Sequence, residues 1–349
     1  MSAAGILLCG HGSRDADAIR EFESVAERMR ARLAGHDVAH GYLEFARPTL
    51  GEALDRMRER GARTVLAVPC MAFAAGHVKN DIPSVLNAYV RRHAVEIRFG
   101  RDLGVDARMM RAAGERLAEA ESAADRALGV VPRHESLLVL VGRGTTDPDA
   151  NSNIAKVARM LWEGMGFGWA AAAYSGVTFP LTAPALEHAA RLGYRRIIVQ
   201  PYFLFTGVLV KRIYRATAHA AERHGAIQFV KAPYLNDHPL VLDSIAARIE
   251  EIASGAGNMN CQLCKYREQV LGFEDEVGLP QASHHQHVEG IGLGDDGAAV
   301  RLHAHHHAHG LAHDHPPGDG RRHGRASAPG GHHPYPHSDH PLGPKSLAE

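Results

Sequence analysis

The sequence predicts an α/β protein built from two homologous parallel-sheet βαβ halves, followed by a disordered histidine-rich tail. Three observations lead to this prediction: short aliphatic runs alternate with stretches of helical period, a constant shift of 132 residues superimposes one half on the other, and the composition changes after about residue 255. The 349 residues are 45% hydrophobic and 22% charged, which is the balance of a globular protein with a substantial core.

The alternation begins at the N-terminus. The aliphatic run 6–9 is followed by apolar residues at three- and four-residue steps, from Ala18 to Leu33. This predicts a strand and then a helix. The same pattern predicts further strands at 38–45, 64–69 and 95–99, and helices at 48–60, 82–92 and 106–120. Strands that alternate with helices indicate a parallel sheet covered on both faces.

The internal repeat sets the domain count. The 132-residue shift places Gly10 and Gly12 on Gly142 and Gly144, and it also pairs Pro48 with Pro180, Pro69 with Pro201 and Lys79 with Lys211. Because glycine and proline determine the backbone path, such coincidences indicate duplication. We expect halves at 1–130 and 131–254, a CxxC segment at 255–281, and a tail at 282–349 too poor in large aliphatics to order itself.

Composition narrows the class of protein. Lys and Arg number 39, as do Asp and Glu, so no net charge draws the chain to nucleic acid or to an anionic membrane. The first apolar run is too short for a signal peptide or a membrane span, and we therefore expect a cytoplasmic protein. Four cysteines are too few for a disulfide scaffold of this length. We expect Cys9 and Cys70 to be buried thiols at strand ends.

Three reactive side chains follow the first three predicted strands. His11 lies in Cys9-Gly10-His11-Gly12-Ser13-Arg14, Glu44 follows the second strand, and His77 follows the third. Because ligands of open α/β sheets bind beyond the carboxyl ends of the strands, we expect the three to converge. Imidazole and carboxylate groups bind divalent transition metals and accept protons. Taken alone, each could instead be a turn-closing histidine or a surface charge.

The repeat provides an internal comparison for this set. Its second copy has Arg143 in place of His11, Gly176 in place of Glu44, and Leu209 in place of His77. The backbone-determining residues persist while all three reactive side chains are absent. We therefore predict that the first half carries the chemistry and that the second half is a structural or substrate-gripping wall.

These residues resemble a known family, the long form of the sirohydrochlorin cobaltochelatases among the class II tetrapyrrole chelatases. The resemblance rests on the 10–14 motif, on Tyr42-Leu43-Glu44 followed by Pro48-Thr49-Leu50, on the segment 69–82 with Gly76-His77, and on the tandem halves. It implies a bilobal fold with the macrocycle between the halves, Co²⁺ as the substrate metal, and residues His11 and His77 that handle the metal and the pyrrole protons.

Other features refine this hypothesis. Iron and nickel enzymes share the motifs, so Fe²⁺, Ni²⁺ or a related tetrapyrrole stays open. No GxxxxGK[ST] loop occurs, which agrees with a reaction that uses no nucleotide. Sirohydrochlorin carries several carboxylates, and positively charged or amide groups near the site are candidates to bind them. These candidates are Gly12, Ser13, Arg14, Arg47 and Lys79.

The last part of the chain adds two candidate metal sites. Cys261 and Cys264 form a CxxC pair that could bind zinc, act as a redox pair or hold an iron–sulfur cluster. Two thiolates do not complete such a site, so a shared site would require a homodimer or another ligand. The family resemblance implies an iron–sulfur cluster. The tail is predicted to bind metal for storage or delivery, unless it is a solvated extension or a tag. Its central histidines are His303, His305, His306, His307, His309, His313 and His315.

Three other functions compete with metal insertion into sirohydrochlorin. A non-enzymatic metal-storage or metallochaperone protein would leave the convergent His–Glu–His set without a purpose. A histidine phosphatase requires an arginine directly before its histidine, where this chain has Gly10. A ferrochelatase that acts on protoporphyrin stays open, because the motifs do not identify the macrocycle.

Overall fold

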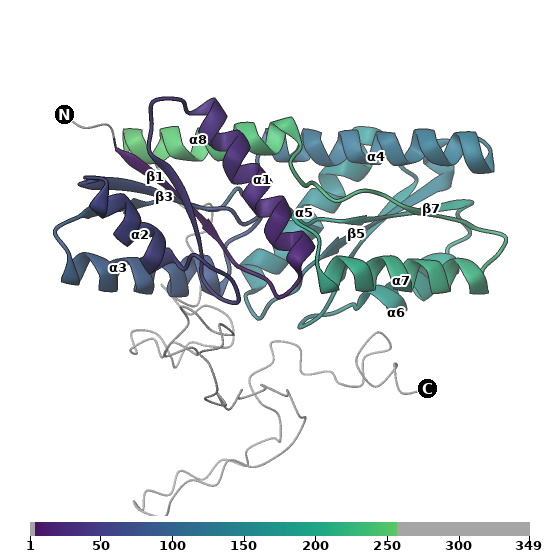
Figure 1. Cartoon of the computed structure of the whole chain (residues 1–349). Coiled ribbons are helices and arrows are strands. Elements are labelled where there is room, and N and C mark those ends of the chain that lie inside the picture. Colours follow the sequence, from purple (N-terminus) through teal and green to yellow (C-terminus); the bar gives the residue numbers. More distant parts are fainter. Residues whose placement is uncertain (1–3, 257–349) are drawn as a thin grey trace, which may run out of the picture.

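Two four-stranded parallel sheets form the framework of the protein. The computed structural model describes residues 4–256. The two sheets lie side by side, and each has the same strand order (Figure 1). This repeated topology confirms the predicted fold class. The first sheet has the order β2-β1-β3-β4, with β1 (Gly5–Gly10), β2 (Val38–Tyr42), β3 (Thr64–Pro69) and β4 (Glu96–Phe99). The second has the order β6-β5-β7-β8, with β5 (Ser136–Gly142), β6 (Trp169–Tyr174), β7 (Arg196–Pro201) and β8 (Gln228–Lys231).

Helices cover both sheets, and local sequence signals fix where they begin. The carboxylate of Asp15 accepts a hydrogen bond from the Asp17 amide at the start of α1, and Thr49 and Glu52 form a reciprocal capping box at the start of α2. No helix in the described range is long and apolar enough to cross a bilayer. The long helices are α1 (Ala16–Arg32), α2 (Leu50–Glu59), α3 (Ile82–Arg92), α4 (Ala107–Leu128), α5 (Pro148–Met165), α6 (Thr182–Ala190), α7 (Val208–Arg223) and α8 (Pro239–Ser254).

The two halves exchange their last helices. Helix α4 ends the first repeat but packs against β7 and β8 of the second sheet, whereas α8 ends the second repeat and packs against β3 of the first (Figure 1). The amide of Gln200 on β7 donates a hydrogen bond to the carbonyl of Ala113 on α4, with an N–O distance of 3.0 Å. The 1–130 and 131–254 halves therefore describe the repeat in sequence, while each lobe in space contains one helix from the other repeat.

Two ion-pair clusters related by the repeat join the lobes. The Lys79 ammonium lies 2.7 Å from an oxygen of Asp147 and 2.8 Å from one of Asp149. In the equivalent cluster, Lys211 contacts Asp15 and Asp17 at 2.6 and 3.0 Å. The Lys79 side chain is 3% exposed and that of Lys211 is 49% exposed. One cluster is thus buried, and the other faces solvent.

Strand β1 runs through the core of the first lobe and positions the loop that carries His11. All six of its residues are buried, which is typical of a parallel strand with helices on both faces. Cys9 on this strand and Cys70 after β3 are free and buried, as predicted. Burial raises the pKa of the Cys70 thiol to about 12, so this cysteine is an unreactive core residue.

Candidate metal centre

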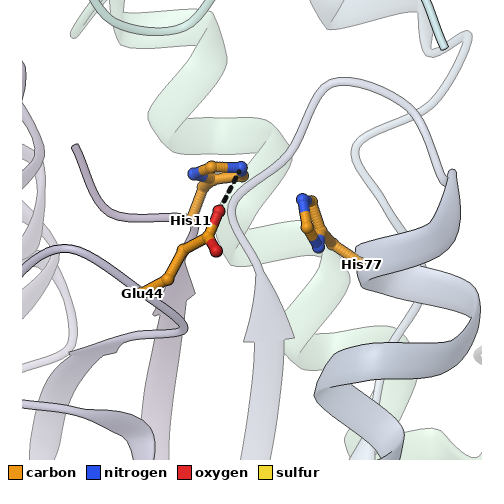
Figure 2. A group of neighbouring side chains, drawn as sticks. All are labelled: His11, Glu44 and His77. Atoms are coloured by element: carbon orange, nitrogen blue, oxygen red, sulfur yellow. Dashed lines mark ion pairs between the residues drawn. The ribbon is translucent and has the colours of Figure 1, made fainter. Parts of the chain in front are cut away.

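His11, Glu44 and His77 meet at the carboxyl edge of the first sheet. His11 and Glu44 follow β1 and β2, and His77 begins the single π-helical turn η1 (His77–Asp81) after β3. One potential ligand atom from each side chain lies within 4.8 Å of the other two. The imidazole centroids are 4.6 Å apart, and Figure 2 shows the carboxylate reaching toward the same space. These three groups could together hold one metal ion.

The backbone of this site is closely packed around Gly12. Gly12 has a φ of +94°, and a Cβ atom placed there would lie 1.6 Å from the Glu44 carbonyl oxygen. Only glycine allows this approach. The Glu44 amide also donates a hydrogen bond to the His11 carbonyl over 3.0 Å. Contact between the two loops therefore fixes the separation of the two ligand-bearing residues.

His11 presents an unshared electron pair toward the carboxylate. Its Nδ1 lies 2.9 Å from the Gly12 carbonyl oxygen, which can only accept, so Nδ1 carries the proton. Nε2 is buried without a hydrogen-bond partner and lies 3.2 Å from Glu44 Oε1. Burial, together with the charges of His77 and Arg143, lowers the pKa of His11 to about 3. The imidazole is therefore neutral at physiological pH and ready to bind a cation.

Glu44 completes a pair of facing acceptors. Its side chain is 8% exposed, and burial raises its pKa above the ordinary value. Two acceptor atoms 3.2 Å apart repel one another unless a proton or a cation lies between them. A proton on Glu44 or a metal ion bound to both residues would satisfy this geometry.

His77 is oriented by a buried carboxylate one helical turn away. Its Nδ1 lies 2.8 Å from Asp81 Oδ2, and the Asp81 side chain is 6% exposed. A carboxylate behind a ligating imidazole fixes the tautomer and leaves Nε2 for the metal. Both side chains are partly exposed, 33% for His11 and 21% for His77, although the His11 Nε2 atom itself is buried beside Glu44.

The predicted carboxylate-binding residues have different surroundings. The Arg14 guanidinium carbon lies 4.6 Å from the centre of the Phe45 ring, beside Glu44, and stays exposed. Arg47 forms an ion pair with Glu52 on α2. Ser13 accepts a hydrogen bond from the Asp15 amide and so supports the start of α1.

Lys79 requires a correction. Its ammonium is enclosed by Asp147 and Asp149 in the buried contact between the lobes, so it is not available to hold a substrate carboxylate. Tertiary pairing of this kind leaves no mark in the local sequence. Cys261, Cys264 and the tail histidines lie outside the described residues, and the sites predicted there stay predictions.

Two residues beside the site were not predicted. Asp81 could have been identified from its position four residues after His77 within a helical segment. Arg143 belongs to the second lobe, yet its charge acts on both His11 and Glu44. The sequence signal for Arg143 was its alignment with His11 in the repeat. That alignment indicated only that the second half lacks a metal-binding histidine at this position.

A bilobal α/β fold with two histidines and a glutamate at one sheet edge suits a protein that handles a divalent metal ion. The profile of the CbiX family matches residues 5–120 and 137–252, and the chain therefore belongs to the CbiX family. The sirohydrochlorin cobaltochelatase of Priestia megaterium is 32% identical over 271 residues, which cover 77% of this chain and 87% of that protein.

Other relatives agree with this assignment. A sirohydrochlorin ferrochelatase of the same organism is 29% identical over 255 residues, covering 72% of this chain and 92% of that relative. The solved structure of SirB from Bacillus subtilis with Fe³⁺ has the same fold, with a TM-score of 0.64 and 24% identity, and the match covers 74% of this chain and 99% of that one.

Proposed function

We propose that this chain inserts Co²⁺ into sirohydrochlorin without using a nucleotide. The observation that carries the proposal is the meeting of His11, Glu44 and His77, whose ligand atoms lie within 4.8 Å of one another in a partly exposed site. The choice of cobalt rests on the cobaltochelatase relative at 32% identity. Iron is the alternative metal, because the ferrochelatase relative is 29% identical, and nickel stays open from the sequence.

The metal is a substrate in this reaction, and the site suits temporary binding. Nε2 of each imidazole and one oxygen of Glu44 supply three ligands, which leaves coordination positions for water and then for ring nitrogens. His11 needs no deprotonation before it binds, because its pKa is about 3. Three ligands are enough to strip part of the hydration shell while a face of the metal stays open to the macrocycle.

Proton transfer follows from charge balance. Insertion replaces two pyrrole N–H protons of the ring with one divalent ion. The site loses two positive charges when the metal moves into the ring, and it can accept the two protons that the ring releases. Glu44, with its raised pKa, is suited to accept one of them once the metal no longer neutralises it. The Nε2 atom of His77 is the second acceptor, and the contact of Nδ1 with the Asp81 carboxylate holds the imidazole in place for this role. The site can then release both protons to solvent.

Two predictions on the rest of the chain stay part of this proposal. We propose that Cys261 and Cys264 bind an iron–sulfur cluster and that the tail histidines bind and store the substrate metal. We also keep a cytoplasmic location. Spectroscopy of the purified full-length chain would test the cluster, and metal titration of a chain truncated after Gly255 would test the store.

The reaction itself can be tested by mixing the purified protein with sirohydrochlorin and Co²⁺, Fe²⁺ or Ni²⁺ and following the absorbance of the ring. His11→Ala and His77→Ala should each lower the insertion rate at least about a hundredfold. His188→Ala is the matched control, because His188 is an exposed histidine on α6 in the second lobe. Wild-type protein that binds metal but never metallates the ring would instead indicate a metallochaperone. Full activity in both histidine variants would refute the proposed site.

A further inference from the structure

Arg143 lies close enough to the metal centre for its charge to act on His11 and Glu44, although it belongs to the opposite lobe. It follows β5 as His11 follows β1, and the next residue, Gly144, repeats the close packing of Gly12: a Cβ atom there would lie 1.8 Å from the Gly176 carbonyl oxygen. The loop that holds Arg143 continues to Asp147, whose carboxylate contacts Lys79 at 2.7 Å. Since Lys79 is two residues after His77, this ion pair places the Arg143 loop beside the metal ligands.

Among the described residues, no carboxylate forms an ion pair with the Arg143 guanidinium, although its charge interacts with that of Glu44 over a longer distance. It donates a long hydrogen bond, 3.3 Å, to the Gly144 carbonyl oxygen, and it forms no ion pair with a carboxylate of the described residues. The side chain is exposed to solvent, and its charge is felt by both His11 and Glu44. Lys79, in contrast, is enclosed by two carboxylates. Arg143 is therefore a cation available to an incoming anion.

The nature of that anion follows from the surroundings. A guanidinium cannot bind the metal ion, and like charge makes it an unfavourable neighbour for a dication. It binds carboxylates through two parallel N–H donors in one plane. A ring that places its nitrogens over the metal centre must extend beyond that centre, and its acidic side chains then reach the facing lobe.

Building on the proposed function, we propose that Arg143 binds a carboxylate of the tetrapyrrole and so anchors the ring from the second lobe, opposite the metal ligands. The duplicated half then has a defined role, because the position that holds the metal in one lobe holds the substrate in the other. A second consequence concerns the metal. The positive charge of Arg143 close to the centre weakens metal binding, and the ring carboxylate neutralises that charge when it docks.

The experiment compares Arg143→Gln and Arg143→Lys with wild type and with Arg126→Gln. Arg126 is an exposed arginine in the last turn of α4, near the N-terminal ends of the strands of the second sheet and therefore far from the site. Equilibrium binding of metal-free sirohydrochlorin is followed by ring fluorescence, binding of Co²⁺ by calorimetry without the ring, and insertion by absorbance.

We expect Arg143→Gln to raise both the dissociation constant and the KM for the ring about tenfold to a hundredfold, because a charge-assisted hydrogen-bond pair is lost. Arg143→Lys should fall between this variant and wild type. The Co²⁺ affinity of Arg143→Gln should equal or exceed that of wild type. Arg126→Gln should match wild type in all three measurements.

Two results would overturn the inference. Ring binding within twofold of wild type would show that Arg143 touches no substrate carboxylate, and a weakened Co²⁺ affinity would show that it supports the metal centre instead. Failure of the proposed function gives a different pattern, since wild type itself would then bind Co²⁺ without metallating the ring. Ring binding without metal still answers the question about Arg143 in that case.

Discussion

Substitution of Gly12 by alanine tests whether contact between two loops sets the geometry of the metal centre. The new Cβ atom would lie 1.6 Å from the Glu44 carbonyl oxygen, whereas real Cβ contacts essentially never fall below 3.0 Å. The loops that carry His11 and Glu44 must therefore separate by at least about 1.4 Å. Because a displacement of about 1 Å can cost a hundredfold in rate, we expect an activity loss of at least that size.

The repeat supplies a matched control for this variant. Gly144→Ala introduces the same kind of strain, with a φ of +82° and a Cβ atom 1.8 Å from the Gly176 carbonyl oxygen, but neither loop of that pair carries a metal ligand. Both variants should lose comparable stability, about 1–3 kcal/mol from the positive φ alone. Only Gly12→Ala should lose Co²⁺ affinity.

The assay combines calorimetric titration with Co²⁺ and insertion rates at a saturating concentration of ring, so that any effect of Gly144→Ala on Arg143 is not mistaken for an effect on the metal. Urea denaturation of both variants gives their stabilities. Wild-type Co²⁺ affinity in Gly12→Ala, or an equal loss of Co²⁺ affinity in the two variants, would refute the proposed control of geometry by loop contact.

Two further predictions concern stability. Lys79→Met should destabilise the protein by about 3 kcal/mol in urea denaturation, because it leaves the buried Asp147 carboxylate without its cation. Lys211→Met, in the exposed equivalent cluster, should destabilise it by at most about 1 kcal/mol. Equal losses of stability in the two variants would contradict this prediction. Asp102 is buried and accepts a hydrogen bond from the Ala74 amide, and burial raises its pKa from 3.8 to about 6. The folded state therefore keeps this proton to a higher pH than the unfolded state does. The contribution of Asp102 to the free energy of unfolding is fully present below pH 4, and about 3 kcal/mol of it is lost as the pH rises through 6. Asp102→Asn should remove the loss, and a difference in unfolding free energy between variant and wild type that stays constant from pH 4 to 7 would speak against it.

The sequence allowed the fold to be predicted because its signals are local and repeated. The strand at 64–69 and the helix at 82–92 have the predicted bounds, since aliphatic runs and helical period mark them directly. The strand expected at 38–45 ends at Tyr42, where the chain turns to place Glu44 at the sheet edge. The exchange of α4 and α8 could not be predicted, because an amphipathic helix does not specify which of two similar sheets it covers.

The metal ligands were predictable for a similar reason. The carboxyl ends of neighbouring parallel strands share an edge, so His11, Glu44 and His77 could be placed together from strand positions alone. What the second lobe contributes could not be obtained in this way. The pairing of Lys79 and the position of Arg143 depend on how the two lobes face one another, and that is determined by tertiary contacts between residues about 70 positions apart.

The exchanged helices tie the two lobes to one another. In the described residues the chain passes between the lobes twice, once from β4 to α4 through residues 100–106 and once from β8 to α8 through residues 232–238. Because each lobe also buries a helix of the other repeat, the two lobes cannot separate unless α4 or α8 leaves the sheet it covers. The metal ligands and Arg143 therefore belong to lobes that the chain itself keeps together.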